Sequence, residues 1–222
     1  MNVETNANKL RFQVEKILEK HPDGLLPIVH TGDPVLRTVS QKYDGQFDDL
    51  LAPLLEAMRK TMLHAPGVGL AAPQIGLGVA IAVMHDLGHP GDIRERTRLD
   101  HQTLINPVYK PLDTQMRSFY EGCLSVPGYQ GVVSRYYRIE LRCENEKGKS
   151  ISDVYTGWPA RIVQHETDHL NGMLYLDKAH IRSLATDENM ATRWADASAV
   201  AAAGVALGFG DTPNKDQSLK QS

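Results

Sequence analysis

The sequence predicts an α+β fold in which helices stand on both sides of a run of strands. Two segments carry strong helical periodicity: residues 47–64, where leucine and methionine recur every three or four positions, and residues 158–173. Between them lie several apolar or alternating runs of strand length. Because these strands follow one another without regularly alternating helices, the pattern favours α+β over a βαβ arrangement.

The remaining elements follow from local patterns. Residues 7–20 have apolar positions at roughly helical spacing and form either a docked helix or a frayed extension. Strands are expected at 79–84, 104–109, 117–120, 137–145 and 150–155, with an exposed loop over 85–100. The alanine-rich stretch 191–207 predicts a weak helix, and the polar stretch 211–222 predicts disorder.

Length and composition limit the class of protein. A chain of 222 residues fits one domain with additional ends better than two full domains. Its formal net charge of -3 gives no global attraction to nucleic acid or anionic membranes, and no nucleic-acid motif is present. No apolar run approaches the roughly 20 residues of a membrane-spanning helix, and the N-terminus lacks the apolar stretch of a signal peptide. With only two cysteines, the chain is expected in a reducing cytoplasm.

The strongest motif is QHETDHLNG, residues 164–172. His165 and His169 are four positions apart, which on a helix places both imidazoles on one face, where they can bind one metal ion. Glu166 lies beside His165 and can act as a general base toward a water molecule. Two surface histidines are the alternative. However, Ile162 and Met173 share the histidine face, so the histidines are expected to point toward the core and to need polar partners there.

A third ligand is required, because catalytic zinc-type sites usually have three protein ligands. Cys123, in the segment EGCLSVPG, is the better candidate, since a thiolate with two imidazoles suits Fe(II), Zn(II), Co(II) or Ni(II). Glu188 lies at a spacing that another metalloprotease pattern uses, and it stays open as a ligand. A further pattern needs histidine at position 175, which is Tyr175. Cys143 lies in an alternating strand and is expected to be an inert buried thiol.

A glycine-rich segment, GVGLAAPQ, spans residues 67–74. Gly67, Gly69 and Ala72 nearly match a dinucleotide-binding fingerprint, but that fingerprint follows a strand and opens a helix. This segment follows a helix, and Pro73 stands where the new helix should run. We interpret it as a loop whose glycines allow close approach to a substrate. The amide of Gln74 is placed to donate to a developing oxyanion.

The segments GVGLAAPQ, EGCLSVPG and QHETDHLNG together resemble the peptide deformylase family, in the same order and with comparable spacing. The similarity runs from about Asp33 to Asp177. It implies mixed or antiparallel strands around a central HExxH helix. It also implies a metal-dependent hydrolase that removes the N-formyl group from the formyl-methionine of nascent polypeptides and releases formate. Such an enzyme is cytoplasmic and meets the ribosome transiently. It holds one divalent metal ion, Fe(II) by expectation, with Zn(II), Ni(II) or Co(II) as alternatives.

The resemblance assigns roles to residues of this sequence. The implied metal ligands are Cys123, His165 and His169. The implied catalytic groups are Glu166 as acid/base, with Gln74 and the backbone N–H of Leu124 as the oxyanion site. The residues expected to line the peptide cleft are Val68, Gly69, Glu121 and Gly122. Glu121 is also expected to form an ion pair with Arg135. Apart from the resemblance, the position of Trp158 and Ile162, one turn apart on the metal helix, leads us to expect them in the pocket for the methionine side chain.

The same resemblance divides the chain into three parts. Residues 1–24 are an N-terminal extension, residues 25–185 the catalytic domain, and residues 186–222 an alanine-rich segment with a polar tail. Two other functions are kept beside the first. One is a zinc endopeptidase that uses His165, His169 and Glu188. The other is a non-catalytic relative that binds ribosomes or nascent chains, although such a protein has no need of Glu166 and Gln74. The oligomeric state is not predicted.

Overall fold

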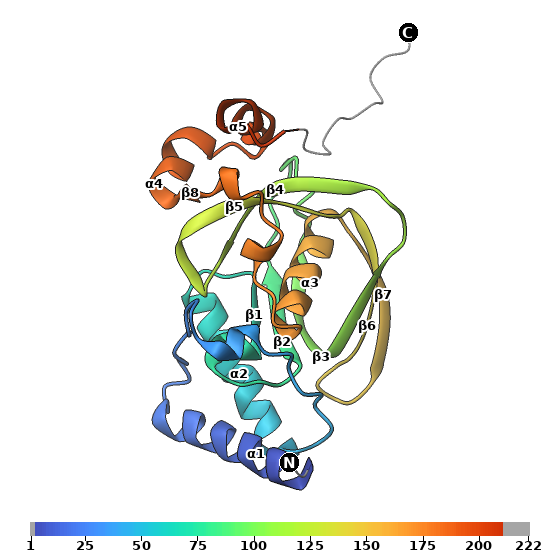
Figure 1. Cartoon of the computed structure of the whole chain (residues 1–222). Helices are drawn as coiled ribbons and strands as arrows, with labels where there is room; N and C mark the ends of the chain where they lie inside the picture. The colour runs from blue at the N-terminus through green and yellow to red at the C-terminus, as the bar shows by residue number, and fades with distance from the viewer. Residues whose placement is uncertain (1–2, 211–222) are drawn as a thin grey trace.

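A computed structural model of the chain describes residues 3–210 and confirms the α+β fold (Figure 1). The strands of the described residues form two antiparallel sheets, with the orders β1-β2-β3-β6-β7 and β4-β5-β8. The first sheet contains β1 (Gly69–Ala71), β2 (Ile81–Asp86), β3 (Leu99–Pro111), β6 (Arg138–Glu144) and β7 (Ser150–Thr156). The second contains β4 (Met116–Cys123), β5 (Val126–Tyr136) and β8 (Ala185–Thr186).

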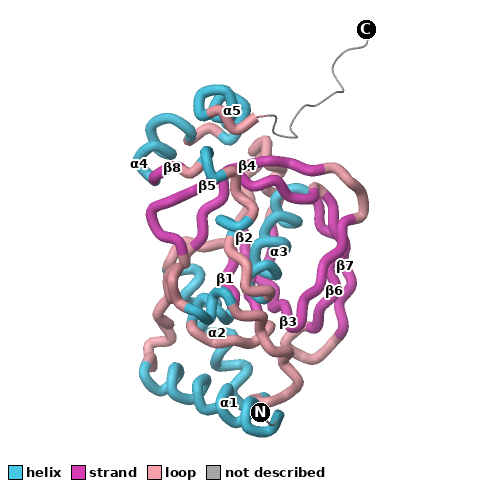
Figure 2. Tube along the Cα trace, viewed as in Figure 1, coloured by secondary structure: helices cyan, strands magenta, loops and turns pink. Residues whose placement is uncertain are grey.

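Helix α3 (Gly157–Leu170) lies in the middle of the molecule, between the two sheets (Figure 2). It packs against strands of both sheets, and most of its residues after the first turn are buried. Ile162 and Val163 join an apolar cluster with the inner face of β2, β3 and β6. The helix begins directly after β7, carries Pro159 in its first turn, and is followed by Gly172 at φ 73°. This helix contains the HExxH motif, so the motif stands inside the core as predicted.

The main error in the predicted strands is the omission of β5 (Val126–Tyr136), which the structure contains. Residues 126–136 contain Pro127, Gly128 and Gly131, which obscure the alternation that identifies a strand. In the structure β5 forms a long hairpin with β4, closed by a turn at Leu124 and Ser125. The register shifts between Gly122 and Cys123, a bulge at the end of β4 that redirects the cysteine side chain.

The N-terminal helices form one side of the molecule. Helix α1 (Val3–Lys20) packs on α2 (Asp48–His64), with Leu10 and Val14 buried in the same apolar cluster as the inner face of α2. Arg11 forms an ion pair with Asp49, 2.6 Å apart, at the start of α2. The N-terminal segment is therefore a docked helix rather than a frayed extension.

The alanine-rich region is not one continuous helix. It comprises α4 (Asp187–Asn189), a π-helical turn (Met190–Trp194), a 3-10 turn (Ala197–Ala199) and α5 (Val200–Leu207). The break falls where the carboxylate of Asp196 accepts the backbone N–H of Ser198, a local bond that competes with helix continuation. The polar stretch 211–222 lies outside the described residues. Other 3-10 turns are η1 (Pro34–Arg37), η2 (Ala72–Ile75), η3 (Tyr175–Asp177) and η4 (Ile181–Ser183).

Residues 87–98 form a loop between β2 and β3, as the polar composition of this stretch predicts. Strand β3 begins at Leu99, five residues before the predicted start of this strand. Within residues 3–210, no helix has the length and apolar character needed to cross a membrane.

Candidate metal centre and active site

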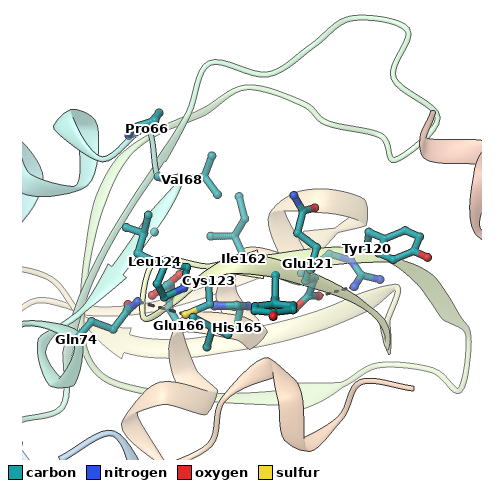
Figure 3. A pocket seen from close by; sticks show the side chains of 18 of the residues that line it. Pro66, Val68, Gln74, Tyr120, Glu121, Cys123, Leu124, Ile162, His165 and Glu166 are labelled. Carbon is teal, nitrogen blue, oxygen red and sulfur yellow. Dashed lines mark hydrogen bonds and ion pairs between the residues drawn. The ribbon is translucent and has the colours of Figure 1, made fainter. Parts of the chain in front are cut away.

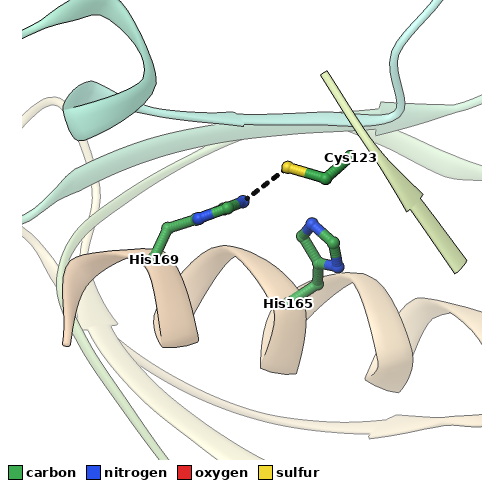
Figure 4. Close-up of side chains that lie close together, drawn as sticks. All are labelled: Cys123, His165 and His169. Carbon is green, nitrogen blue, oxygen red and sulfur yellow. Dashed lines mark hydrogen bonds between the residues drawn. The ribbon is translucent and has the colours of Figure 1, made fainter. Parts of the chain in front are cut away.

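The three candidate metal ligands, Cys123, His165 and His169, converge beside α3 (Figure 4). Cys123 is the last residue of β4, and His165 and His169 stand one turn apart on α3. The Sγ atom of Cys123 lies 3.3 Å from Nε2 of His169. One ligand atom from each of the three residues lies within 4.8 Å of the other two. Among the residues that the structure describes, no other group of three His, Cys, Asp or Glu side chains has this geometry.

The surroundings of these side chains fit a divalent metal ion. Nδ1 of His165 lies 3.0 Å from a carboxylate oxygen of Glu121, so its other ring nitrogen is left for the metal. Burial holds the pKa of His169 well below its usual range, which keeps this imidazole neutral, as a ligand must be. At His165 burial also opposes the charged form, but Cys123 and Glu121 outweigh it and raise the pKa to about 10. Cys123 and Glu121 therefore favour positive charge at this position, which a bound divalent ion would supply in place of the proton.

Glu166 lies on α3 with its carboxylate against β1. The residue is 3% exposed, and its Oε2 atom has no hydrogen-bond partner among the described residues. Burial raises the pKa of Glu166 to about 7, although His165 and Arg135 favour the charged form. A Cβ atom at Gly69 would stand 2.0 Å from Oε1 of Glu166. Glycine at this position therefore leaves the space that the carboxylate occupies, a role that the sequence did not reveal.

Gln74 reaches the metal-binding residues from the turn η2 (Figure 3). Its Oε1 atom accepts the backbone N–H of Ala71 at 2.9 Å, which fixes the orientation of the amide. The Nε2 group is thereby directed toward Cys123, 3.5 Å from the sulfur. Leu124 follows Cys123 in the β4–β5 turn, so its backbone N–H lies next to the same ligand. Two N–H donors thus come from two different segments, the turn η2 and the β4–β5 turn.

A buried network of charges supports the ligand segment. Arg135 binds Glu121 through two hydrogen bonds, of 2.7 Å and 2.9 Å, and the expected ion pair is thus present. Arg135 also binds Asp168 at 2.7 Å, and Lys178 pairs with the same carboxylate oxygen at 2.6 Å. Arg161 donates to Glu121 and to the carbonyl oxygens of two strand residues. Glu121 is 5% exposed and Arg135 2% exposed, so the ion pair between them is shielded from water.

Electrostatic balance determines the charge states in this network. Burial alone would raise the pKa of Glu121, but Arg135 and Arg161 outweigh burial and hold that pKa well below its usual range. Burial is the larger effect at Arg161, where it lowers the pKa to about 10. Arg161 and Asp168 were missed from the sequence. Their spacing could have revealed them: Arg161 lies four positions before His165 and Asp168 three positions after it. On a buried helix this spacing puts both residues on the same side as His165.

A cleft of about 630 Å³ opens onto the metal-binding residues. The four residues that the resemblance assigned to the peptide cleft line it, as do the two residues expected in the methionine pocket: Val68, Gly69, Glu121 and Gly122, with Trp158 and Ile162. The walls also include Arg94 and Arg96 from the loop 87–98, and Asp187 from α4. These three residues were not predicted, because nothing local in the sequence links their segments to the cleft.

The alternative ligands do not join the site. Glu188 is exposed in α4 and lies outside the ligand cluster. The hydroxyl of Tyr175 donates to the carbonyl oxygen of Tyr129 at 3.0 Å, and its ring stacks parallel to His165 at 6.5 Å. Gly172 adopts φ 73°, and a Cβ there would meet the backbone of Arg37 at 2.8 Å. Chain packing explains this glycine. Because Glu188 lies outside the ligand cluster, the structure does not support the ligand set of the zinc endopeptidase hypothesis.

Comparisons with known proteins agree with this geometry. A sequence model of the family described as polypeptide deformylase matches residues 25–184. The chain is 50% identical over 208 residues to peptide deformylase 3 of Streptomyces avermitilis, covering 91% of this chain and 92% of that protein. It is 48% identical over 206 residues to the peptide deformylase of Bifidobacterium adolescentis, covering 90% and 94% of the two chains.

Solved structures give the same result. The crystal structure of peptide deformylase from Thermotoga maritima superposes with a TM-score of 0.62 at 36% identity, covering 70% of this chain and 97% of that one. A Met-Ala-Ser-bound class I type b peptide deformylase from Acinetobacter baumannii superposes with a TM-score of 0.64 at 32% identity, covering 69% and 98%. The fold, the convergent site and these relatives agree, and the chain therefore belongs to the peptide deformylase family of metal-dependent enzymes, which remove the N-formyl group from nascent polypeptides.

Proposed function

We propose that this chain hydrolyses the formyl amide of formyl-methionyl peptides at a single divalent metal ion held by Cys123, His165 and His169. One observation carries the proposal. The three ligand atoms lie within 4.8 Å of one another, at a cleft that Glu166 and Gln74 also line. A structural metal site has no need of a buried carboxylate without a partner or of an oriented amide, so the arrangement supports catalysis.

The bound ion supplies a Lewis acid that lowers the pKa of water and polarises the formyl carbonyl. The donor set of one thiolate and two imidazoles accepts several divalent ions, and we propose Fe(II) in the cell, with Zn(II), Ni(II) or Co(II) as functional substitutes. Glu121 orients His165 through its Nδ1 atom, and Arg135 and Arg161 hold Glu121 in turn.

Glu166 acts as the general acid and base. It takes a proton from the attacking water and later returns it to the amine of the leaving methionyl peptide. Both tasks need a carboxyl group that exchanges protons near neutral pH, and burial raises the pKa of Glu166 to about 7. The partner-free Oε2 atom leaves this carboxylate available to water and substrate.

Gln74 and the backbone N–H of Leu124 stabilise the negative oxygen that develops when water attacks the formyl carbon. The Gln74 amide is already oriented by its bond to Ala71, so little reorganisation accompanies the reaction. Formyl carries only hydrogen beside its carbonyl group. We propose that the close packing of Gly69 against Glu166 leaves no room for the methyl group of an acetylated peptide.

The peptide lies between two sheet edges. β1 ends the five-stranded sheet and β4 ends the three-stranded sheet, and residues of both strands line the cleft. Unpaired backbone groups at such edges bind an extended peptide by adding a strand. This accounts for a substrate that is recognised by its backbone as well as by the methionine side chain, for which we propose the pocket at Trp158 and Ile162.

Contact with the ribosome and a cytoplasmic location remain predictions, which follow from a substrate that emerges from ribosomes. The decisive test of the proposed function is formate release from formyl-Met-Ala-Ser by metal-loaded enzyme. Stoichiometric appearance of formate and free Met-Ala-Ser supports the proposal. Cleavage at an internal peptide bond, or binding of the peptide without turnover, would replace it with the endopeptidase or the non-catalytic hypothesis.

A further inference from the structure

The loop 87–98 is docked on the first turn of α3. Its residue Arg94 places the guanidinium over the ring of Trp158, 4.7 Å from the ring centroid. Both residues line the cleft that contains the metal-binding residues. The loop thus reaches the pocket wall from a segment that is remote from α3 in sequence.

Arg94 is held in this position from behind. Its Nε atom lies 2.9 Å and 3.0 Å from the two carboxylate oxygens of Asp92, and its Nη2 atom lies 2.5 Å from one of them. The Asp92 side chain is only 7% exposed, and Arg94 lowers its pKa to about 2. The pair is therefore partly buried and geometrically fixed, unlike an exposed ion pair whose side chains move freely.

Neighbouring residues secure the rest of the loop. The carboxylate of Glu95 accepts the hydroxyl of Tyr137 at 2.6 Å, and Glu95 packs against Gly157 at the start of α3. Arg96 binds the buried carboxylate of Asp86 at 2.7 Å and 3.0 Å. The loop is thus attached to the core on both sides of Arg94.

The indole of Trp158 is also held by residues of the core. The Arg161 guanidinium lies 5.7 Å from its centroid, and the Phe119 ring meets it edge-on at 6.4 Å. Arg161 and Phe119 are themselves fixed, at 4% and 8% exposure. Of the groups that hold the indole, Arg94 alone belongs to the loop 87–98. The position of the indole in the pocket wall therefore depends on a contact that the loop supplies.

We propose that Arg94 is a specificity-determining residue, which fixes Trp158 and thereby sets the width of the pocket that receives the side chain next to the formyl group. This inference rests on the proposed function. With Arg94 in place, the pocket admits the unbranched, flexible thioether of methionine and disfavours a bulky aromatic ring. Without Arg94, the guanidinium volume is vacated and the indole is free to move outward, so larger side chains enter more easily.

The test compares Arg94→Ala with wild type on formyl-Met-Ala-Ser and formyl-Phe-Ala-Ser. The ratio of the two kcat/KM values is expected to fall about fivefold (about 1 kcal/mol), the contribution of a cation–π contact of this kind. This change in the ratio should come mainly from the KM values of the two peptides rather than from kcat, because the loop does not touch the metal ligands or Glu166. Arg98→Ala is the matched control, since within residues 3–210 the one ion pair of Arg98 is with exposed Asp100. An unchanged ratio in Arg94→Ala would overturn the inference.

A second measurement reports on the indole itself. In a Trp194→Phe background, Trp158 is the only tryptophan of the chain, and acrylamide should quench its fluorescence more strongly after Arg94→Ala. Arg94→Lys keeps a cation but not the two-point pairing, so in both assays it should give values between those of wild type and Arg94→Ala. If the alanine variant folds poorly, Arg94→Lys compared with wild type provides the test. Equal quenching in all variants would contradict the proposal. If wild type releases no formate from formyl-Met-Ala-Ser, the proposed function fails instead.

Discussion

Replacing Glu121 by alanine should destabilise the protein and weaken metal retention together. Its carboxylate is 5% exposed and accepts hydrogen bonds from Arg135, Arg161 and His165. Without it, the hydrogen-bond acceptors left to Arg161 among the described residues are two backbone carbonyl oxygens, whereas Arg135 still binds Asp168. Removing one partner of a buried ion pair costs about 3–5 kcal/mol. For a chain of this size, that loss corresponds to a Tm lower by about 6–20 °C.

The assay is thermal unfolding combined with metal analysis of the same sample. Glu146→Ala is the matched control, because Glu146 is exposed in the β6–β7 turn and should change stability by no more than about 0.5 kcal/mol. In the double variant Glu121→Ala with Arg135→Ala, the loss of stability should be clearly less than the sum of the two single losses. Each single change already removes the same Glu121–Arg135 interaction. A Glu121→Ala protein that melts and binds metal like wild type would refute the supporting role of the network.

Three further predictions concern the reaction centre. Glu166→Gln should leave metal content near wild type and lower turnover by about two to four powers of ten, measured as formate release; near-normal turnover would remove Glu166 from its role. Gly69→Ala should lower turnover with metal retained, because the added Cβ stands 2.0 Å from Glu166 Oε1. Gly78→Ala is the control and should leave turnover unchanged, because no atom lies within 4 Å of a Cβ at that position. Equal activity of the two variants would contradict the steric argument. Iron-loaded enzyme should lose activity in air faster than nickel- or zinc-loaded enzyme, because the iron and then Cys123 are oxidised. Under nitrogen the iron-loaded enzyme should keep its activity. Equal decay of all forms in air would contradict this prediction.

The sequence predicted what local spacing encodes. The four-residue interval between His165 and His169 is enough to put both imidazoles on one helical face, and the apolar residues of the same helix indicate that the face is buried. The same periodicity predicted the helix ends at residues 20 and 64, whereas α3 ends at Leu170, three residues before its predicted end. These features depend on neighbours along the chain, so no knowledge of the tertiary arrangement is needed.

Features that depend on distant partners were not predictable in this way. Strand β5 is stabilised by pairing with β4 and β8 on its two sides, which compensates for Pro127 and two glycines within it. Arg161 looks like any helical arginine until Glu121 and two strand carbonyls are placed around it. Arg94 belongs to a polar loop, and only the packing of that loop on α3 brings it to the cleft.

The central claim is that Cys123 completes a catalytic metal site with two histidines of α3. The most direct test measures metal content and formate release from formyl-Met-Ala-Ser on one preparation of Cys123→Ala, with Cys143→Ala as the control, since Cys143 is buried in β6 outside the site. The predicted result is that Cys123→Ala loses both its metal and its formate release, whereas Cys143→Ala keeps both. A Cys123→Ala protein that keeps its metal and its formate release would contradict the claim.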